Sequence, residues 1–483
     1  MIEAFYCKPQ RIKRASINSL FEGFSEEDTR LLEEIQRRAF LYFWERADVH
    51  TGLVTDRARN EGTDAYEVAS IAATGYALAA LPIGVEHGWI TQAQGRQRAL
   101  LTLDFLVNHL GNKHGWFYHF MDRRTGRRVW KSEISSMDSA LLLIGALACG
   151  QYFQQGPQND YDGNNNENKN ELAEKAVLAQ RVAELYGRVD WNWMRTRGGR
   201  QPAKLTLSHG WKPERGFLPY DWDRYSEAIL LYLLGLGAAS EDGYVPLPAA
   251  SWQAWSRNIY AQDGMETLTG GPMFLHQMAH GFYDFRGRRD GLGYDYWVSA
   301  QNAMEVHRQF CRLWAAKRKT YALGFWGLNA SDSPKGYTAY GLPAPEDGTV
   351  SPNGVIAGLQ LAPTACMETI QAFYNYQPER LWGRYGFVDA LSVDKGWFGR
   401  DVIGIDVGMA LIAIENHCTG LIWKLASALP STARAYQRAG LHITQEAHPR
   451  LLRLPTAPHT FEIDQECRNK ILEGTQEPKK PGR

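Results

Sequence analysis

The chain has 483 residues, of which 44% are hydrophobic, and its 53 Lys and Arg residues balance 53 Asp and Glu residues. A net charge of zero leaves no surplus of positive potential for phosphates or anionic lipid, which argues against binding to nucleic acid or to a membrane surface. The sequence has no run of about 18 uncharged apolar residues, so we expect no membrane span.

Helical periodicity dominates the chain. The segment Thr29–Ala47 places Leu32, Ile35 and Phe43 on one face and Glu and Arg side chains on the other, which predicts an amphipathic helix. Similar patterns predict further helices at about residues 66–81, 91–110, 137–153, 171–186, 225–236, 251–261, 297–313, 363–374 and 406–423.

Some of these helices are apolar almost all the way round, notably the runs that follow Asp138 and Glu227. Such helices are typical of an inner layer, whereas amphipathic helices are typical of an outer layer. Alternating inner and outer helices, joined by loops rich in Gly, Trp, Tyr and Asp, predict an all-α fold, the (α/α)6 barrel. The absence of a fixed-length sequence repeat argues against a superhelical solenoid.

The predicted domain organisation is simple. We expect an N-terminal extension over residues 1–28, a single barrel domain over 29–470 and a disordered tail over 471–483. The Asn-rich segment 155–170 is polar throughout, so we interpret it as a mobile surface loop of the barrel.

The cysteines and the N-terminus bear on location. Six cysteines lie far apart with no paired spacing, so we expect reduced and mostly buried thiols. The first residues lack the apolar core of a secretion signal, which favours a cytoplasmic protein. A periplasmic or secreted protein whose leader had been removed would look the same.

The aromatic content points to a ligand class. The chain holds 16 Trp, 23 Tyr and 19 Phe residues. A Trp on a loop beside Gly and Asp often forms a flat apolar platform with a polar edge, which suits a sugar ring. The sequence therefore predicts a carbohydrate ligand.

Three carboxylates recur in one setting, because Asp138, Glu227 and Asp406 each open an apolar helix. If the inner helices run parallel, their N-termini converge on one face, and the three residues form an acid/base set there. Taken alone, each is explained more simply as an acid that caps a helix and interacts with its dipole. The interleaving of aromatic and polar residues before each carboxylate favours the acid/base set. Before Glu227 the candidate substrate-binding residues are Trp211, Tyr220, Trp222 and Tyr225.

A second group of candidates follows Glu227. His276 and His280 have the i, i+4 spacing of metal ligands, but the segment lacks the Glu of a metalloprotease helix, so we predict no metal. We expect Gln277, His280 and Asp284 to bond sugar hydroxyls or to hold the pocket together.

Asp332 and Tyr337 lie in a turn-rich loop, where a substrate contact and a structural Asx-turn are equal alternatives, and Asp347 is interpreted as a turn residue. The sequence contains neither a phosphate-binding Gly-rich loop after a strand nor a nucleophile-elbow Ser, so we expect no nucleotide or other cofactor.

Over most of its length the chain resembles the glycoamylase-like proteins that include glycoside hydrolase family 144, the β-1,2-glucanases. The stretches that carry the resemblance run in family order and are RRAFLYFWERADVHTGLVTDR, VASIAATGYALAA, ISSMDSALLLIGAL, YSEAILLYLLGLG, FLHQMAHGFYDFRGRRD, WGLNASDSPKGYTAYG, DGTVSPNG, RLWGRYGFVDAL and IGIDVGMALIAIENHCTGLIWK. The resemblance implies an (α/α)6 barrel and inverting hydrolysis of β-1,2-linked glucan. By position it implies that Glu227 is the general acid, that Asp138 is an acidic pocket residue and that Asp406 is the base.

The chain departs from the family pattern at two positions. Val407 stands where the family leads us to expect Gln, and Cys418 stands where it leads us to expect Arg. The first difference affects water placement or substrate contacts near Asp406. Both differences motivate an alternative function, a carbohydrate-binding protein that has kept the fold and lost the activity.

The chemistry adds a constraint. A helix N-terminus favours the charged form of an acid, so a general acid at Glu227 needs apolar walls, such as Tyr225 and Trp222, or a second carboxylate to raise its pKa. Inversion needs about 6.5–9.5 Å between acid and base, whereas a retaining pair lies at about 5–5.5 Å. We therefore predict a monomeric inverting hydrolase of β-1,2-glucan or a related β-glucan, with a retaining transglycosylase as the enzymatic alternative.

Overall fold

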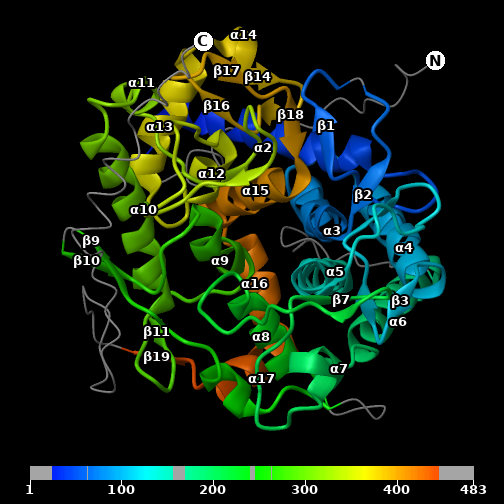
Figure 1. Cartoon of the computed structure of the whole chain (residues 1–483). Coiled ribbons are helices and arrows are strands. Elements are labelled where there is room, and N and C mark those ends of the chain that lie inside the picture. The colour runs from blue at the N-terminus through cyan, green and yellow to red at the C-terminus, as the bar shows by residue number, and fades with distance from the viewer. Residues whose placement is uncertain (1–23, 63, 156–168, 240–244, 263, 445–483) are drawn as a thin grey trace, which may run out of the picture.

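The computed structural model describes residues 24–62, 64–155, 169–239, 245–262 and 264–444, and these residues are mostly helical (Figure 1). The helices are α2 (Glu26–Arg46), α3 (Ile71–Glu86), α4 (Gln92–Asn108), α5 (Ser136–Gln155), α6 (Lys169–Gly187), α7 (Trp191–Met194), α8 (Ile229–Gly237), α9 (Met278–Phe282), α10 (Tyr296–Leu313), α11 (Lys319–Ala322), α12 (Pro352–Ala357), α13 (Pro363–Asn375), α14 (Pro378–Leu381), α15 (Gly404–Cys418), α16 (Leu421–Ser427) and α17 (Pro430–Ala439). Among the described residues, 3-10 turns accompany them at η2 (Thr196–Gly199), η3 (Ala249–Gln253) and η4 (Met273–His276).

The strands are short and form two- and three-stranded antiparallel ladders. They are β1 (Arg57–Arg59), β2 (Val68–Ser70), β3 (Asn112–Lys113), β4 (Trp116–Phe117), β5 (Phe120–Asp122), β6 (Ile134–Ser135), β7 (Gly210–Lys212), β8 (Gly216–Phe217), β9 (Tyr260–Gln262), β10 (Met265–Thr267), β11 (Arg288–Arg289), β12 (Ala330–Ser331), β13 (Thr338–Ala339), β14 (Trp382–Gly383), β15 (Gly386–Phe387), β16 (Leu391–Ser392), β17 (Trp397–Phe398), β18 (Asp401–Ile403) and β19 (His442–Ile443).

Helices α3, α5, α8, α9, α12 and α15 surround a common centre in Figure 1. Along this series α3 contacts α5, α5 contacts α8, α8 contacts α9, α12 contacts α15 and α15 contacts α3, while η4 contacts both α9 and α12. The other long helices, α2, α4, α6, α10, α13 and α17, lie outside them (Figure 1). The predicted difference between inner and outer helices is seen in their burial. Every residue of the inner helix α8 is buried, whereas three residues of the outer helix α6 are buried.

Helix α5 is long and apolar enough to cross a membrane by length and composition, and the bent pair α15 and α16 passes the same test together. However, 89% of the apolar window of α5 is buried inside the protein. Packing against α3 and α8 therefore accounts for its apolar surface.

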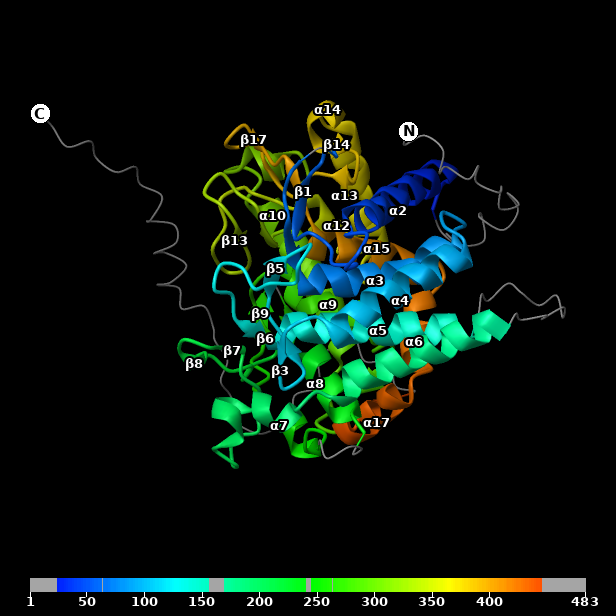
Figure 2. The same cartoon turned by 90° about the vertical axis from the view of Figure 1, so that its right-hand side faces the viewer.

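The helices α3, α5 and α15 start at one end of the molecule, where Figure 2 shows strands β5 and β6 gathered beside α3 and α5. Backbone hydrogen bonds connect these starts through neighbouring segments: Gly404 N donates to Asp56 O (2.7 Å), Ile71 N to His119 O (3.1 Å), His119 N to Glu133 O (2.9 Å) and Ser136 N to His209 O (3.1 Å). These bonds hold the residues that precede each helix close to those of the next.

Several predicted boundaries need correction. Helix α2 begins at Glu26 because Ser25 and Asp28 form a capping box, so it starts inside the predicted extension. The predicted helix 251–261 is wrong, since η3 ends at Gln253 and strand β9 begins at Tyr260. The Arg257 guanidinium donates to the carbonyls of Trp252 and Trp255, and this contact replaces the next helical turn.

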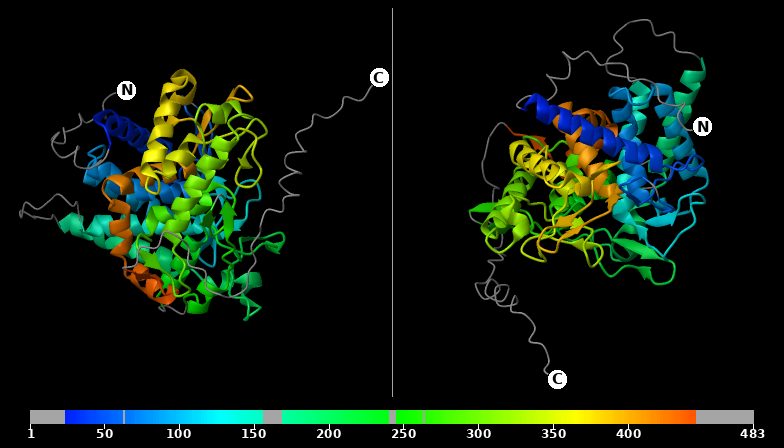
Figure 3. Two further views of the ribbon diagram at one scale, coloured as in Figure 1. Left: turned by 90° about the vertical axis from the view of Figure 1, so that its left-hand side faces the viewer. Right: turned by 90° about the horizontal axis from the view of Figure 1, so that it is seen from above.

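The predicted helix 406–423 divides at Gly420, whose φ of 67° lies in the left-handed region, and α16 turns by 90° from α15. Figure 3 shows this turn and the outer helices from two further sides. The predicted tail 471–483 and residues 156–168 of the predicted loop lie outside the described residues. Within those residues, the four cysteines are free thiols, and Cys149, Cys311 and Cys366 are buried.

Candidate active site

Glu227 lies two residues before α8, and its side chain is buried, with 7% of the residue exposed. Its backbone carbonyl accepts a hydrogen bond from Leu230 N (3.1 Å), so the residue belongs to the turn that leads into the helix. Its Oε2 atom has no hydrogen-bond partner among the residues that the structure describes. Burial, with a contribution from the nearby charge of Asp138, raises the pKa of Glu227 to about 7.

Asp138 lies in the first turn of α5, where its Oδ2 accepts a hydrogen bond from Ser135 Oγ at 2.5 Å. His119 connects this carboxylate to a second one, because its Nε2 lies 3.6 Å from Asp138 Oδ1 and its Nδ1 lies 3.0 Å from Glu133 Oε1. Burial opposes a charged imidazole, but Asp138 and Glu133 together raise the pKa of His119 above its ordinary value. The imidazolium form is thus stabilised between two carboxylates.

Asp406 lies in the first turn of α15 and is 2% exposed, and its Oδ2 lacks a partner within the described part of the chain. A hydrogen bond joins its carboxyl to that of Asp389, which is fully buried between β15 and β16. Burial and the charge of Asp389 raise the pKa of Asp406 well above its ordinary value, while burial and the charge of Asp332 raise the pKa of Asp389 to about 7. The pair therefore favours a state that keeps one proton.

The Asp389 carboxyl is held from the other side by the loop that follows β12. Asp389 Oδ2 accepts a hydrogen bond from Asp332 N at 2.7 Å. The Asp332 carboxylate accepts two contacts from Arg57 Nη1, at 3.0 and 3.1 Å. Arg57 Nε also lies 3.4 Å from Asp56 Oδ2, so one guanidinium forms ion pairs with both Asp56 and Asp332.

The two groups of acids adjoin each other. The charge of Asp56 interacts with those of His119 and Asp138, and it also acts on Asp406. The phenol of Tyr76, buried in α3, lies within reach of the charges of both Asp406 and Asp138, which add to burial in raising its pKa. The structure thus brings Asp138, Glu227 and Asp406 to one end of the helices.

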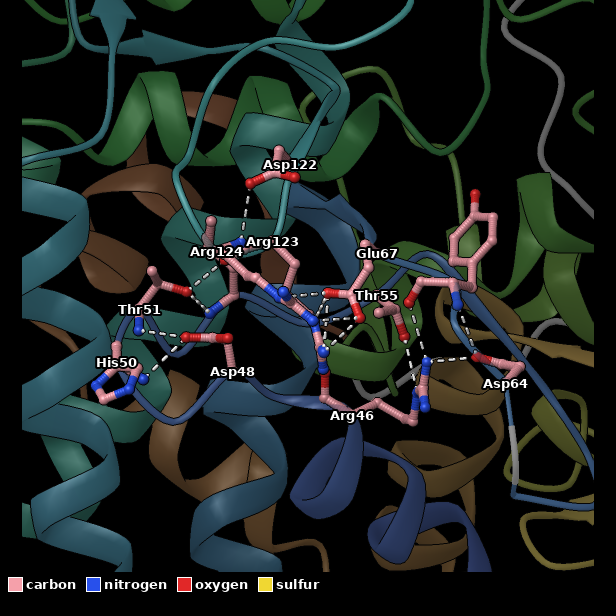
Figure 4. A network of polar contacts seen from close by, with 12 residues as sticks. Arg46, Asp48, His50, Thr51, Thr55, Asp64, Glu67, Asp122, Arg123 and Arg124 are labelled. Atoms are coloured by element: carbon pink, nitrogen blue, oxygen red, sulfur yellow. Dashed lines mark hydrogen bonds and ion pairs between the residues drawn. The ribbon is translucent and has the colours of Figure 1, made fainter.

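A polar network fixes the loop that carries Asp56 and Arg57 (Figure 4). Arg46, at the end of α2, donates to Asp64 at 2.7 Å. Arg123 donates to both Glu67 oxygens at 3.0 Å, and its carbonyl accepts a hydrogen bond from Thr51 Oγ1. These contacts bind Thr51 and Glu67 to the loop after β5 and Asp64 to the end of α2.

The predicted aromatic residues divide into two pairs. Tyr225 is buried, and Glu227 adds to burial in raising its pKa, so it lies beside the Glu227 carboxyl as predicted. The Trp222 ring stacks on His209 with 3.6 Å between centroids, and its Nε1 donates to Ser136 Oγ at the start of α5. Trp211 packs instead against Trp193 on the three-stranded ladder, and Tyr220 is 67% exposed beside His209.

Three further candidates make contacts with other parts of the protein. The Gln277 amide donates to Gly354 O at 2.9 Å and so connects η4 to α12. His280 is fully buried between Phe285 and Trp297, and burial lowers its pKa to about 3. Asp284 pairs with Arg286 at 2.7 Å beyond the end of α9. Their contacts support the alternative in which such residues hold the structure together.

Tyr337 has 54% of its surface exposed, yet burial of its phenol and the charges of Asp406 and Asp389 raise its pKa well above the ordinary value. It therefore lies at the open side of that pair. Within the described residues, His, Cys, Asp and Glu side chains form no group of three or more that could hold a metal ion.

Sequence reasoning missed Asp389, Asp56, Arg57 and His119. Asp56, Arg57 and Asp389 lie within GLVTDR and YGFVDAL, two of the stretches that carry the family resemblance, and this was the available signal. His119 precedes Phe120 in a stretch rich in aromatic residues, where nothing marks it as a partner of Asp138.

The chain is similar to known proteins over most of its length. The model of the Glycoamylase family matches residues 219–430. A Parabacteroides distasonis protein described as an exo β-1,2-glucooligosaccharide sophorohydrolase (non-reducing end) is 25% identical over 441 residues, which cover 85% of this chain. This chain spans 58% of the length of that relative.

Two crystal structures share the fold. A protein from Bacteroides uniformis, provisionally named a glucoamylase, superposes with a TM-score of 0.76 at 26% identity over 87% of this chain and 99% of its own. An endo-β-1,2-glucanase from Chitinophaga pinensis, in complex with sophorotriose and glucose, also gives 0.76, at 23% identity over 86% of this chain and 99% of its own. These matches confirm the predicted resemblance of this chain to the glycoamylase-like family.

Proposed function

We propose that this protein hydrolyses β-1,2-glucan, or a closely related β-gluco-oligosaccharide, with inversion of the anomeric centre. The observation that carries the proposal is the Glu227 carboxyl, which is buried beside Asp138, has a free oxygen and has a pKa of about 7. A carboxyl in this state keeps its proton near neutral pH and has an oxygen free to donate it to a glycosidic oxygen.

The Asp389–Asp406 pair supplies the base. Near neutral pH the pair retains one proton and carries one negative charge, which the two carboxyls share across their hydrogen bond, and the pair takes up a proton from the attacking water at the unpartnered Asp406 Oδ2. Two carboxyl groups in different environments thus take the two roles that inversion requires.

The surroundings support a sugar substrate. Tyr225 lies beside the Glu227 carboxyl, Trp222 bonds Ser136 at the start of α5, and Tyr337 lies at the open side of the Asp389–Asp406 pair. We further propose that the six central helices close into an (α/α)6 toroid with the site at the end where α3, α5 and α15 start. The names of the sophorohydrolase and of the sophorotriose-bound glucanase favour β-1,2-linked glucose as the substrate.

A product screen on β-1,2-, β-1,3- and β-1,4-glucans tests the proposal. We expect reducing sugar from the β-1,2-linked chain and, by proton NMR, the α-anomer as the first product. A first-formed β-anomer would instead identify a retaining transglycosylase. Binding without release of reducing sugar at any pH would favour the non-catalytic alternative that Val407 and Cys418 motivate.

A further inference from the structure

A strained turn near the candidate site displays an exposed indole. Trp130 lies in the segment between β5 and β6, and 63% of its surface is exposed. Trp130 and Lys131 both have positive φ, of 54° and 50°, and Ser132 N donates to Val129 O at 3.0 Å. A four-residue turn with two positive φ values ordinarily contains Gly, Asn or Asp at its central positions, because bulky side chains are disfavoured there.

The strained turn is firmly held. Ser132 Oγ donates to Phe120 O, and Phe120 N donates back to Ser132 Oγ at 3.3 Å. Arg128 clamps the Ser132 carbonyl from the opposite side at 2.5 Å. These hydrogen bonds thus maintain a backbone that Trp130 and Lys131 do not favour, and retained strain of this kind is found mainly at functional sites.

A series of ring contacts leads from this indole to the acids. Trp130 meets Phe120 edge to face, with 5.2 Å between ring centroids. Phe120 stacks on His119 with centroids 3.8 Å apart, and His119 Nε2 lies 3.6 Å from Asp138 Oδ1. One edge of the indole is thereby fixed on a rigid aromatic base, while most of its surface faces solvent.

Resting on the proposed function, we propose that Trp130 forms an outer sugar-binding subsite, which stacks a glucose unit of the glucan chain on the rim of the site. A β-glucose ring presents axial C–H groups on both faces, and an exposed indole is the side chain best suited to pack against them. Trp130 would act on binding of the chain and not on the bond cleavage at Glu227.

Binding of β-1,2-, β-1,3- and β-1,4-glucans to a Glu227→Gln parent, measured by calorimetry, tests this role without turnover. We expect Trp130→Ala to weaken binding of the preferred glucan about five- to tenfold, the scale of one aromatic contact, while Trp130→Phe keeps most of it. Lys131→Gly, which relieves strain in the same turn and keeps the indole, should leave binding unchanged and raise Tm.

The double variant Trp130→Asn, Lys131→Gly installs the preferred turn residues. We expect it to melt at a higher temperature than the parent and to bind glucan as weakly as Trp130→Ala. Unchanged binding in Trp130→Ala, with the parent binding normally, would overturn the subsite, as would a parent that binds none of the glucans. Preference of the parent for another linkage, with the Trp130 effect intact, would contradict the proposed substrate and leave the subsite standing.

Discussion

At the scale of single residues, the site depends on keeping protons on buried acids. The charge of Asp138 adds to burial at Glu227, and Asp389 and Asp406 repel each other across a shared hydrogen bond. The positive charge of Arg57 lowers the pKa of Asp389, because it favours the ionised carboxylate. The two carboxyl roles are therefore set by neighbours that lie far away in the sequence.

The replacement Asp389→Asn tests how Asp389 affects the proposed catalytic base, Asp406. The groups that act on Asp406 are Asp389, Asp332 and Asp56, and of these Asp389 contributes most after burial. Removing its negative charge lowers the pKa of Asp406, so the acid limb of the kcat/KM profile should move to lower pH by about one unit or more. The measurement is the pH dependence of β-1,2-glucan hydrolysis by the variant and the parent.

Asp394→Asn is the matched control. Asp394 lies in the hairpin of β16 and β17, which follows Asp389, and it accepts hydrogen bonds from Lys319 N and Thr320 N at the start of α11. It should lower Tm and leave the acid limb in place. An unmoved limb in Asp389→Asn would show that Asp389 only supports the structure.

At the scale of elements, α3 and α5 approach so closely that only glycine fits between them. A Cβ atom on Gly145 would lie 2.0 Å from the carbonyl oxygen of Gly75, and one on Gly75 would lie 2.4 Å from that of Leu141. Backbone atoms of two buried helices cannot move aside easily. This crossing positions Asp138, because its helix is fixed against α3.

We expect Gly145→Ala to lower the free energy of unfolding by about 3 kcal/mol, as overpacking in a rigid core does. Gly187→Ala offers the control, because nothing lies within 4 Å of a Cβ there at the end of α6. That change should be neutral or stabilising by up to about 1 kcal/mol. Urea unfolding measures the free energy of unfolding of both variants. Equal values for Gly145→Ala and Gly187→Ala would contradict the close approach of α3 and α5.

Periodicity predicted the helices well because burial of one face depends on neighbours three or four residues apart. It failed at residues 251–261, where Arg257 reaches back to the carbonyls of Trp252 and Trp255. The acid cluster could not be predicted in full, since Arg57 meets Asp332 across 275 positions of the sequence. Only the fold brings such residues together.

At the scale of the whole molecule, the buried acids make stability depend on pH. Glu227 has a pKa of about 7 in the folded state against an ordinary value of 4.5, so the folded protein binds the proton more tightly than the unfolded chain. Its contribution to stability is complete below about pH 4.5 and is lost as the pH rises to about 7. Asp389, also raised to about 7, acts in the same direction.

The wild-type protein should therefore lose more unfolding free energy between pH 5 and 8 than Glu227→Gln does, by on the order of 3 kcal/mol. Urea unfolding at the two pH values measures the difference between the proteins. Equal losses would mean that Glu227 is ionised in the folded protein and cannot serve as an acid at neutral pH.

The most direct measurement of the central claim is kcat of Glu227→Gln on β-1,2-glucan, together with glucan binding by the same variant. The amide keeps the size of the side chain but has no proton to give to the leaving oxygen, and positioned proton transfer contributes about 10²–10⁴-fold. We predict a fall in kcat of at least about 100-fold with binding close to that of the wild type. Retention of more than about a tenth of the wild-type kcat would contradict the assignment of Glu227 as the general acid.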